Sequence, residues 1–284
     1  MHVKNIHNKP YNFSKLTAAN PALKPYVFTN EYHKESVNFA LPEAVFELNK
    51  ALLMAHYGLV DYQLPVGYLC PPVPSRADYL WHLKDLITPK FNMVKGLDIG
   101  VGANAIYSIL GAQLFGWQML GVDTNEKSVQ LAEHNCLLTP NVSKLVTIRL
   151  QNYPGFIFKN IIEPDNYLDF TMCNPPFHSS PEAALKGTNR KLKNLNLQAA
   201  PRLNFGGQAH ELWCNGGEAL FIKRMIKESV QFSNQVGWFT TLVSKAAHLP
   251  KLIKQLEKLK AEHRIINMEQ GQKITRILAW RFTT

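Results

Sequence analysis

The sequence has few cysteines, few acidic residues and no long apolar run. Its four cysteines, Cys70, Cys136, Cys173 and Cys214, lie far apart and form no Cys-x-x-Cys pair. Structural zinc sites and disulfide-rich secreted domains depend on closely spaced cysteines, so the sequence predicts reduced thiols and no metal site. No apolar run is long enough for a transmembrane helix, and residues 1–5 lack the apolar core of a signal peptide. A cytoplasmic protein is therefore expected.

The shortage of acidic residues leaves a strongly basic chain. Against 31 Lys and Arg there are 21 Asp and Glu, which gives a net charge of +10 over 284 residues. This charge predicts an anionic partner, either nucleic acid or, as the alternative, an anionic membrane surface. The hydrophobic content of 46% supports one large folded domain, or one domain with an appendage.

The N-terminal third differs in composition from the rest. Residues 1–34 are rich in Lys, His, Asn and Pro, contain Glu31 as their only acid, and predict an extended basic arm. A solvated tail is the alternative, although the aromatic residues of this stretch favour an arm that packs or binds. Apolar spacing predicts an amphipathic helix over residues 42–57. After a proline-rich connector, Ser75 is expected to cap a second helix that starts near Arg76.

From residue 93 onwards, short apolar strands alternate with helical segments. Alternation of this kind predicts a doubly wound, mostly parallel α/β sheet. Two final strands separated only by a turn predict an antiparallel edge. The expected strands cover residues 93–99, 118–122, 145–150, 167–173, 236–243, 264–268 and 276–282, and the expected helices cover residues 103–114, 125–138, 216–232 and 249–259.

A glycine-rich loop joins the first expected strand to its helix. It contains Asp98, Gly100, Gly102 and Asn104, and Asp123 ends the next strand. Glycines let a backbone pass close beneath a ligand, and an acid at that separation can bind a ribose. The third glycine of the dinucleotide-binding motif is missing, which weakens the interpretation as a nicotinamide-dependent oxidoreductase. The combination is typical of class I S-adenosylmethionine-dependent methyltransferases.

A second motif, Asn174-Pro175-Pro176-Phe177, follows the expected strand at residues 167–173. Neither proline can continue the strand, so a stiff loop is expected at its carboxyl end. The amide of Asn174 and the carbonyl of Pro175 can accept hydrogen bonds from a planar amino group, and the ring of Phe177 can stack on the base that carries it. His178 is adjacent and is expected to serve the loop rather than the chemistry.

Taken together, the motifs resemble the bacterial 23S ribosomal RNA adenine-N6 methyltransferase F family, which is related to the eukaryotic enzyme that methylates U6 small nuclear RNA. The resemblance covers nearly the whole chain. It rests on residues 70–79, 98–104, 173–178, 204–208 and 211–218.

The resemblance implies N6-methylation of one adenine in 23S ribosomal RNA, with S-adenosyl-L-methionine as methyl donor, S-adenosyl-L-homocysteine as product and no metal. It implies a class I methyltransferase domain over residues 91–284. Residues 1–90 would form a helical and extended region that binds RNA and covers the cofactor site. The implied catalytic residues are Asn174, Pro175, Pro176 and Phe177. The implied cofactor-binding residues are Arg76, Asp98, Gly100, Gly102, Asn104, Asp123, Gln151 and Asn174.

A basic stretch follows the Asn174 motif and contains no acid between Glu182 and Glu211. Its charge would bind RNA phosphates without choosing a sequence. The residues expected to do so are Lys186, Arg190, Lys191, Lys193 and Arg202. A solvated basic loop is the alternative interpretation.

Other function classes stay open at this point. A glutamine methyltransferase of release factors shares the Asn-Pro-Pro core, although it usually carries Tyr after the prolines. A non-catalytic RNA-binding or assembly factor on the same fold is a second alternative, which intact Asp98, Asp123 and Asn174 disfavour. A monomer is expected, and the target adenine is not determined by the sequence.

Overall fold

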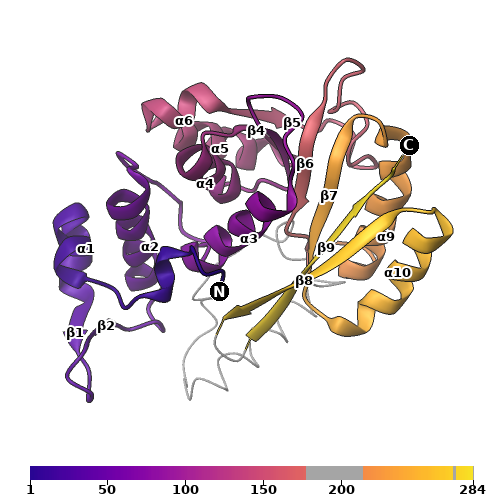
Figure 1. The fold of residues 1–284 in the computed structure, drawn as a ribbon. Helices are drawn as coiled ribbons and strands as arrows, with labels where there is room; N and C mark the ends of the chain where they lie inside the picture. Colours follow the sequence, from indigo (N-terminus) through magenta and orange to yellow (C-terminus); the bar gives the residue numbers. More distant parts are fainter. Residues whose placement is uncertain (177–213, 271–272, 284) are drawn as a thin grey trace.

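A seven-stranded mixed sheet forms the centre of the protein, and helices cover both of its faces (Figure 1). The computed structural model describes residues 1–176, 214–270 and 273–283. No helix in these three ranges is long and apolar enough to cross a membrane. In sheet order the strands are β5 (Val146–Leu150), β4 (Gln118–Asp123), β3 (Lys95–Ile99), β6 (Leu168–Cys173), β7 (Val236–Val243), β9 (Lys273–Arg281) and β8 (Glu262–Gln270).

The strand directions confirm the predicted doubly wound sheet. β5, β4, β3, β6 and β7 are mutually parallel, whereas β9 runs antiparallel to both β7 and β8. The antiparallel edge expected from the two final strands is therefore present, with the reversed strand second from the edge. The chain winds from β3 outward through β4 to β5 and then returns to place β6 on the other side of β3.

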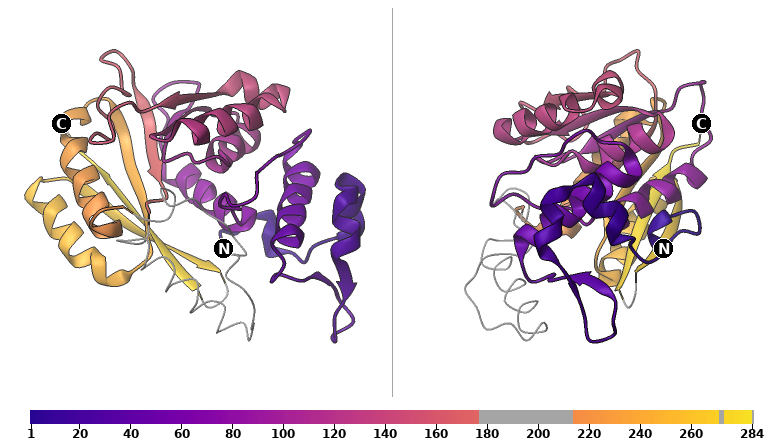
Figure 2. Two further views of the ribbon diagram at one scale, coloured as in Figure 1. Left: turned by 180° about the vertical axis from the view of Figure 1, so that it is seen from behind. Right: turned by 90° about the vertical axis from the view of Figure 1, so that its left-hand side faces the viewer.

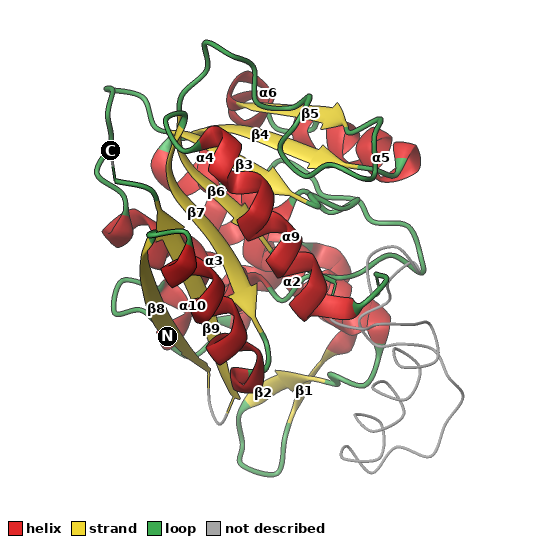
Figure 3. Ribbon diagram, turned by 90° about the vertical axis from the view of Figure 1, so that its right-hand side faces the viewer, coloured by secondary structure: helices red, strands yellow, loops and turns green. Residues whose placement is uncertain are grey.

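Two apolar cores lie on the two faces of the sheet. Side chains alternate between the faces along a strand, so Trp238 and Leu242 of β7 join one core while Phe239 and Val243 join the other. Figures 1 and 3 show helices on opposite faces. One face carries α3 (Val73–Leu86), α4 (Ile106–Phe115), α5 (Glu126–Leu137) and α6 (Pro140–Leu145). The other face carries α9 (Gly217–Ser229) and α10 (Leu249–Lys258). Two short 3-10 turns, η3 (Val230–Phe232) and η4 (Ala246–His248), lie next to these two helices in the chain.

The N-terminal region is folded, so the prediction of an extended arm over residues 1–34 is wrong. Asn12 caps a short helix by accepting a hydrogen bond from the Lys15 N–H at 2.9 Å, and Phe13, Leu16 and Leu23 are buried. These apolar residues recur at helical spacing, but each element is too short to give a periodic signal. The elements of residues 1–37 are η1 (Ile6–Asn8), α1 (Phe13–Ala19), η2 (Pro21–Tyr26), β1 (Val27–Thr29) and β2 (Glu35–Val37). They are followed by α2 (Pro42–Tyr57), which confirms the helix predicted from apolar spacing over these residues.

Two helix starts differ from the expectation. α3 begins at Val73 because Pro72 occupies the N-cap and Pro74 the first turn, where a fixed φ suits a helix. Ser75 lies inside the helix, and its hydroxyl donates to the Pro72 carbonyl at 3.1 Å instead of capping. α4 begins at Ile106, three residues later than expected, because Ala105 adopts a left-handed φ of 47°. Neither α6 nor the β1–β2 hairpin was expected from the sequence.

Helix α3 lies between the N-terminal region and the sheet. Figures 1 and 2 both place α1 and α2 on the far side of α3 from β6 and β7. The apolar core on this face is continuous and includes residues of α1 and α2 together with residues of the sheet. The division of the chain near residue 90 stays a prediction.

Gly96 of β3 offers a test of how closely the central strands pack. A Cβ at this position would lie 2.3 Å from the Phe170 ring of β6, which is fully buried. We expect Gly96→Ala to lower the free energy of unfolding by about 1–3 kcal/mol, because the ring has no room to move. Urea unfolding measures this change. Gly155→Ala is the matched control, because nothing lies within 4 Å of its Cβ position; equal stabilities of the two variants would contradict the packing argument.

Candidate active site

The candidate site lies where three neighbouring parallel strands end. Ile99 of β3 pairs with Val122 of β4 on one side and with Cys173 of β6 on the other. The residues that follow these three are Gly100, Asp123 and Asn174, so the sheet brings them to one edge. The winding direction reverses between β3 and β6. In open α/β sheets, ligands bind in the crevice at such a switch point.

The glycine loop passes through left-handed backbone conformations. Gly100 has a φ of 72° and Gly102 a φ of 61°, values that side chains with a Cβ rarely adopt. The N–H groups of Gly100 and Val101 both donate to the Val122 carbonyl at 2.9 Å, which holds the loop against β4. Nothing lies within 4 Å of a Cβ position on Gly100. The loop therefore borders open space at Gly100.

Asp123 connects the glycine loop to the turn after β4. Its Oδ2 accepts a hydrogen bond from the Gly102 N–H at 3.0 Å, and its Oδ1 accepts one from the Asn125 N–H at 2.9 Å. The side chain is only partly buried. A carboxylate has about four acceptor positions. Asp123 thus has capacity left for hydroxyl donors of a ligand.

Asp98 lies beneath the loop and is almost fully buried, with 1% exposure. Its Oδ2 accepts a hydrogen bond from the Ser108 hydroxyl at 3.2 Å. Burial raises the pKa of the Asp98 carboxyl to about 7, and the nearby Asp123 carboxylate acts in the same direction. The Ser108 hydrogen bond and the positive charge of Arg76 lower this pKa without offsetting the burial. Asp98 is therefore a carboxyl whose charge changes near neutral pH.

Five buried polar atoms of the described residues have no hydrogen-bond partner, four of them on Arg76, Asp98, Tyr107 and Asn174 near this crevice and one on Thr171, two positions inside β6. Buried polar groups in proteins are nearly always paired, so a group of unpaired atoms marks a place where a ligand completes the hydrogen bonding. The Arg76 guanidinium also lies over the Tyr107 ring, 5.4 Å from its centre. Among the residues described, the unpaired atoms are Arg76 Nε, Asp98 Oδ1, Tyr107 Oη, Thr171 Oγ1 and Asn174 Oδ1.

Asn104 and Gln151 shape the crevice with side chains that are already bonded. Asn104 Oδ1 accepts from the Ile106 N–H at 3.1 Å and so holds the start of α4. Gln151 Nε2 donates to the Lys159 carbonyl at 2.9 Å, and its Oε1 accepts from the Tyr153 N–H at 3.1 Å. Both side chains are buried. Their expected role as cofactor contacts stays a prediction, and their observed contacts are with the backbone of the protein.

The catalytic motif lies partly within the structure. Pro175 is buried and Pro176 is partly buried, directly after Asn174 at the end of β6. Phe177 and His178 lie outside the described residues. So do the basic residues Lys186, Arg190, Lys191, Lys193 and Arg202.

Glu218 is a buried acid to which the sequence analysis gave no role. It lies in the first turn of α9 with 1% exposure. Its Oε1 accepts from the Ser244 N–H at 2.7 Å, and its Oε2 lies 2.6 Å from Nδ1 of His248. Glu218 thus fixes the turn after β7, the strand next to β6. Two glycines directly before it, both with positive φ, are the sequence signal that could have drawn attention to it.

Comparisons with known proteins agree with this geometry. A family model described as an RNA methyltransferase matches residues 1–284. The ribosomal RNA large subunit methyltransferase F of Christiangramia forsetii is 54% identical over 99% of this chain and 100% of its own length. The protein of that name from Flavobacterium johnsoniae is 46% identical over 99% of this chain and 93% of its own length.

The chain belongs to this RNA methyltransferase family.

Solved structures of related proteins support the same conclusion. The catalytic domain of hMettl16 in complex with the MAT2A 3′UTR hairpin 1 superposes with a TM-score of 0.84 at 30% identity, covering 100% of this chain and 96% of that one. The N-terminal domain of human METTL16 in complex with SAH gives 0.78 at 28% identity, covering 100% and 99%. These likenesses identify the sheet as that of a class I methyltransferase. Membership of an RNA methyltransferase family also favours RNA over a release factor as the methyl acceptor.

Metal-ligating side chains do not cluster in the described part of the chain. No group of three or more His, Cys, Asp or Glu side chains lies close enough together there to hold an ion.

The raised pKa of Asp98 predicts that the free energy of unfolding depends on pH. The unfolded chain ionises this carboxyl above about pH 4, whereas the folded protein keeps it protonated up to about pH 7. Stability from Asp98 is therefore complete below about pH 4 and is lost as pH rises toward 7. We expect the free energy of unfolding of Asp98→Asn, relative to wild type, to rise across this window by at most about 1.4 kcal/mol per pH unit and then to level.

Urea unfolding of the ligand-free protein between pH 4.5 and 8 measures this difference. Asp165→Asn is the control, because that carboxyl is exposed. A constant difference between Asp98→Asn and wild type across the window would show that Asp98 ionises normally in the folded protein.

Proposed function

We propose that this protein transfers a methyl group from S-adenosyl-L-methionine to N6 of one adenine in 23S ribosomal RNA. Three points support the substrate. The curated relatives are named as large-subunit ribosomal RNA methyltransferases, the net charge of +10 suits an RNA partner, and the Asn-Pro-Pro-Phe motif follows the strand beside the glycine loop. A monomeric state and a cytoplasmic location stay predictions.

The single observation that carries the proposal is the unpaired amide oxygen of Asn174. It is buried at the end of β6, and no described group donates to it. A buried acceptor without a partner costs about 1–3 kcal/mol in the free protein, so the site favours a ligand that brings an N–H donor. The amino group of adenine is such a donor. A neutral amide oxygen can accept this hydrogen bond without the cost of burying a charge.

The residues around the glycine loop fit S-adenosylmethionine. Its amino-acid end carries a carboxylate and an ammonium group. Arg76 Nε is a buried unpaired donor that would bind the carboxylate, and Asp98 Oδ1 is a buried unpaired atom that would accept from the ammonium group once the Asp98 carboxyl is ionised. Asp123 would accept the ribose hydroxyls. Gly100 would let the ligand lie close to the backbone.

The chemistry required of the protein is alignment. The N6 lone pair of adenine is delocalised into the ring, and the cofactor supplies a methyl group that is already activated on a sulfonium. Asn174 Oδ1 and the Pro175 carbonyl would accept the two N6 protons, so that the nitrogen becomes more pyramidal and its lone pair points at the methyl carbon. Alignment of this kind contributes up to about 7–11 kcal/mol to lowering a barrier. No strong base is needed beforehand, because the proton becomes acidic only after transfer.

The target adenine must leave its base stack to reach this crevice. Extrusion costs a few kcal/mol and is cheapest in a looped or single-stranded segment. We expect Phe177 to stack on the extruded ring, and the basic residues Lys186, Arg190, Lys191, Lys193 and Arg202 to bind the neighbouring phosphates.

The role proposed for Asp123 predicts a loss of cofactor affinity in Asp123→Ala. Each charge-assisted hydrogen bond to a ribose hydroxyl contributes roughly 1.5–3 kcal/mol, so affinity should fall at least about tenfold. Asp123→Asn keeps one acceptor oxygen, so its cofactor affinity should lie between those of the wild type and Asp123→Ala. Calorimetry with S-adenosylmethionine measures the change. Unaltered affinity in a folded Asp123→Ala variant would remove Asp123 from the cofactor site.

The proposed reaction is tested by incubating the protein with 23S ribosomal RNA and S-adenosylmethionine, followed by mass spectrometry of the nucleosides. We expect one N6-methyladenosine per RNA. Asn174→Ala should keep cofactor affinity within a few-fold while losing nearly all turnover, because its contact acts on the transition state. Asn166→Ala, at an exposed asparagine, is the control. A methylated base other than adenine, or full turnover by Asn174→Ala, would contradict the proposal.

A further inference from the structure

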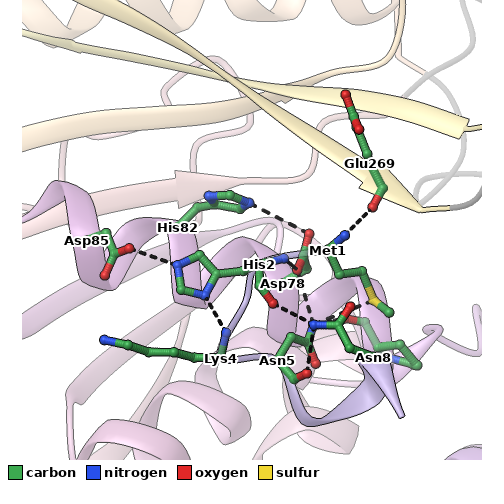
Figure 4. Close-up of polar contacts among 10 residues, drawn as sticks. Met1, His2, Lys4, Asn5, Asn8, Asp78, His82, Asp85 and Glu269 are labelled. Carbon is green, nitrogen blue, oxygen red and sulfur yellow. Dashed lines mark hydrogen bonds and ion pairs between the residues drawn. The ribbon is translucent and has the colours of Figure 1, made fainter. Parts of the chain in front are cut away.

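Within the first eight residues, which we call the N-terminal segment, His2 and Asn5 hydrogen-bond to helix α3, the helix that carries Arg76. Figure 4 shows the contacts. The His2 backbone N–H donates to Asp78 Oδ1 at 2.6 Å, and the His2 ring contacts the Asp85 carboxylate at 2.8 Å. The same ring stacks on Trp81 with a centroid separation of 5.7 Å. The segment therefore follows the face of α3 that carries residues 78, 81 and 85.

Asn5 is the most deeply placed polar residue of this segment, with 2% exposure. Its Nδ2 donates to the Pro74 carbonyl at 3.0 Å and to Asp78 Oδ1 at 3.2 Å. Its Oδ1 accepts from the His7 N–H at 3.1 Å and so caps the 3-10 turn η1. One amide thus ties the N-terminal segment to Pro74 and Asp78, which lie one turn apart near the start of α3.

Arg76 lies midway along the turn that Asn5 bridges. Residues four apart share a face of a helix, whereas successive residues are about 100° apart, so Arg76 points away from Pro74 and Asp78. There its guanidinium lies against Tyr107, with a buried unpaired Nε. Pro72, the N-cap residue of α3, makes no side-chain cap, and the N-terminal end of the helix is held by Asn49, whose Oδ1 accepts from the Val73 N–H at 2.9 Å. Asn5 holds the same turn from its other side, through Pro74 and Asp78. A rotation of that turn would move Arg76 directly.

Asp78 is a buried carboxylate of α3 that depends on the N-terminal segment for hydrogen bonds. Its carboxylate is 2% exposed, and its described partners are the His2 N–H, the Asn5 amide and His82, whose Nε2 lies 3.8 Å away. Two of these three groups come from the N-terminal segment. Removing the segment would leave a buried carboxylate with little compensation.

We propose that Asn5 is a positioning residue that holds the first turn of α3 and thereby fixes Arg76 in the cofactor site. This inference rests on the proposed function, since it takes Arg76 to bind the cofactor carboxylate. Asn5 touches no ligand in this scheme. It acts through α3.

The test compares Asn5→Ser with Arg76→Ala and with the double variant. A serine at position 5 keeps the cap of η1, because serine is a good N-cap, but its side chain is too short to reach Pro74 and Asp78. We expect Asn5→Ser to weaken S-adenosylmethionine binding roughly tenfold, or about 1.4 kcal/mol. Adding Arg76→Ala should cost little more than Arg76→Ala alone, because both changes remove the same contact.

Asn12→Ser is the matched control. Asn12 also caps a helix, as the N-cap of α1, and in the described residues its side chain hydrogen-bonds to the Lys15 N–H of its own helix. Cofactor affinity should be unchanged in this variant. Thermal unfolding of each variant confirms the fold, and Asn5→Ala repeats the measurement without a cap if Asn5→Ser is poorly folded.

The outcomes separate the two hypotheses. Full cofactor affinity in Asn5→Ser, with weakened affinity in Arg76→Ala, would overturn the positioning role alone. Losses that add in the double variant would also overturn it, because Asn5 would then act independently of Arg76. Full affinity in Arg76→Ala would instead refute the cofactor role proposed for Arg76.

Discussion

The pairing of Ile99 with both Val122 and Cys173 is the constraint on which the site depends. Three parallel strands held in this register end at one edge, so the glycine loop, Asp123 and Asn174 meet without any long side chain reaching across. The reversal of winding between β3 and β6 leaves a crevice there. Close contact between Gly96 and the Phe170 ring shows how little freedom these strands have to slide.

Buried polar groups without a hydrogen-bond partner raise the free energy of the folded protein when no ligand is bound. Arg76, Asp98 and Asn174 each bury a polar atom that no described residue pairs, and burial raises the pKa of the Asp98 carboxyl to about 7. Clusters of such groups are common at functional sites, where a ligand or water supplies partners. Arg76 offers a hydrogen-bond donor, whereas Asp98 and Asn174 offer acceptors. Asp98 and Asn174 belong to different strands, so these groups suit two ligands of different chemistry that meet at the strand ends.

Helix α3 links the N-terminal region to the crevice. One side of it receives His2 and Asn5, and the other presents Arg76 and Tyr79, whose hydroxyl lies 2.8 Å from Thr240 of β7. The region expected to be an extended arm is thus part of the packing that surrounds the site. The short elements of residues 6–37 were not predicted, because each spans few residues and is stabilised by contacts with distant parts of the chain. Such contacts produce no periodic pattern in the local sequence.

The sequence by itself determined the α/β alternation, the antiparallel edge and the positions of the glycine loop, Asp123 and Asn174 at strand ends. These follow from local signals: apolar runs, glycines that permit positive φ, and prolines that stop a strand. Only the tertiary structure decided that Glu218 holds the turn after β7 and that Asn5 spans the turn bearing Arg76. The hydrogen-bond partners are 26 residues apart for Glu218 and Ser244 and 69 residues apart for Asn5 and Pro74, so they are set by packing and leave no local pattern in the sequence.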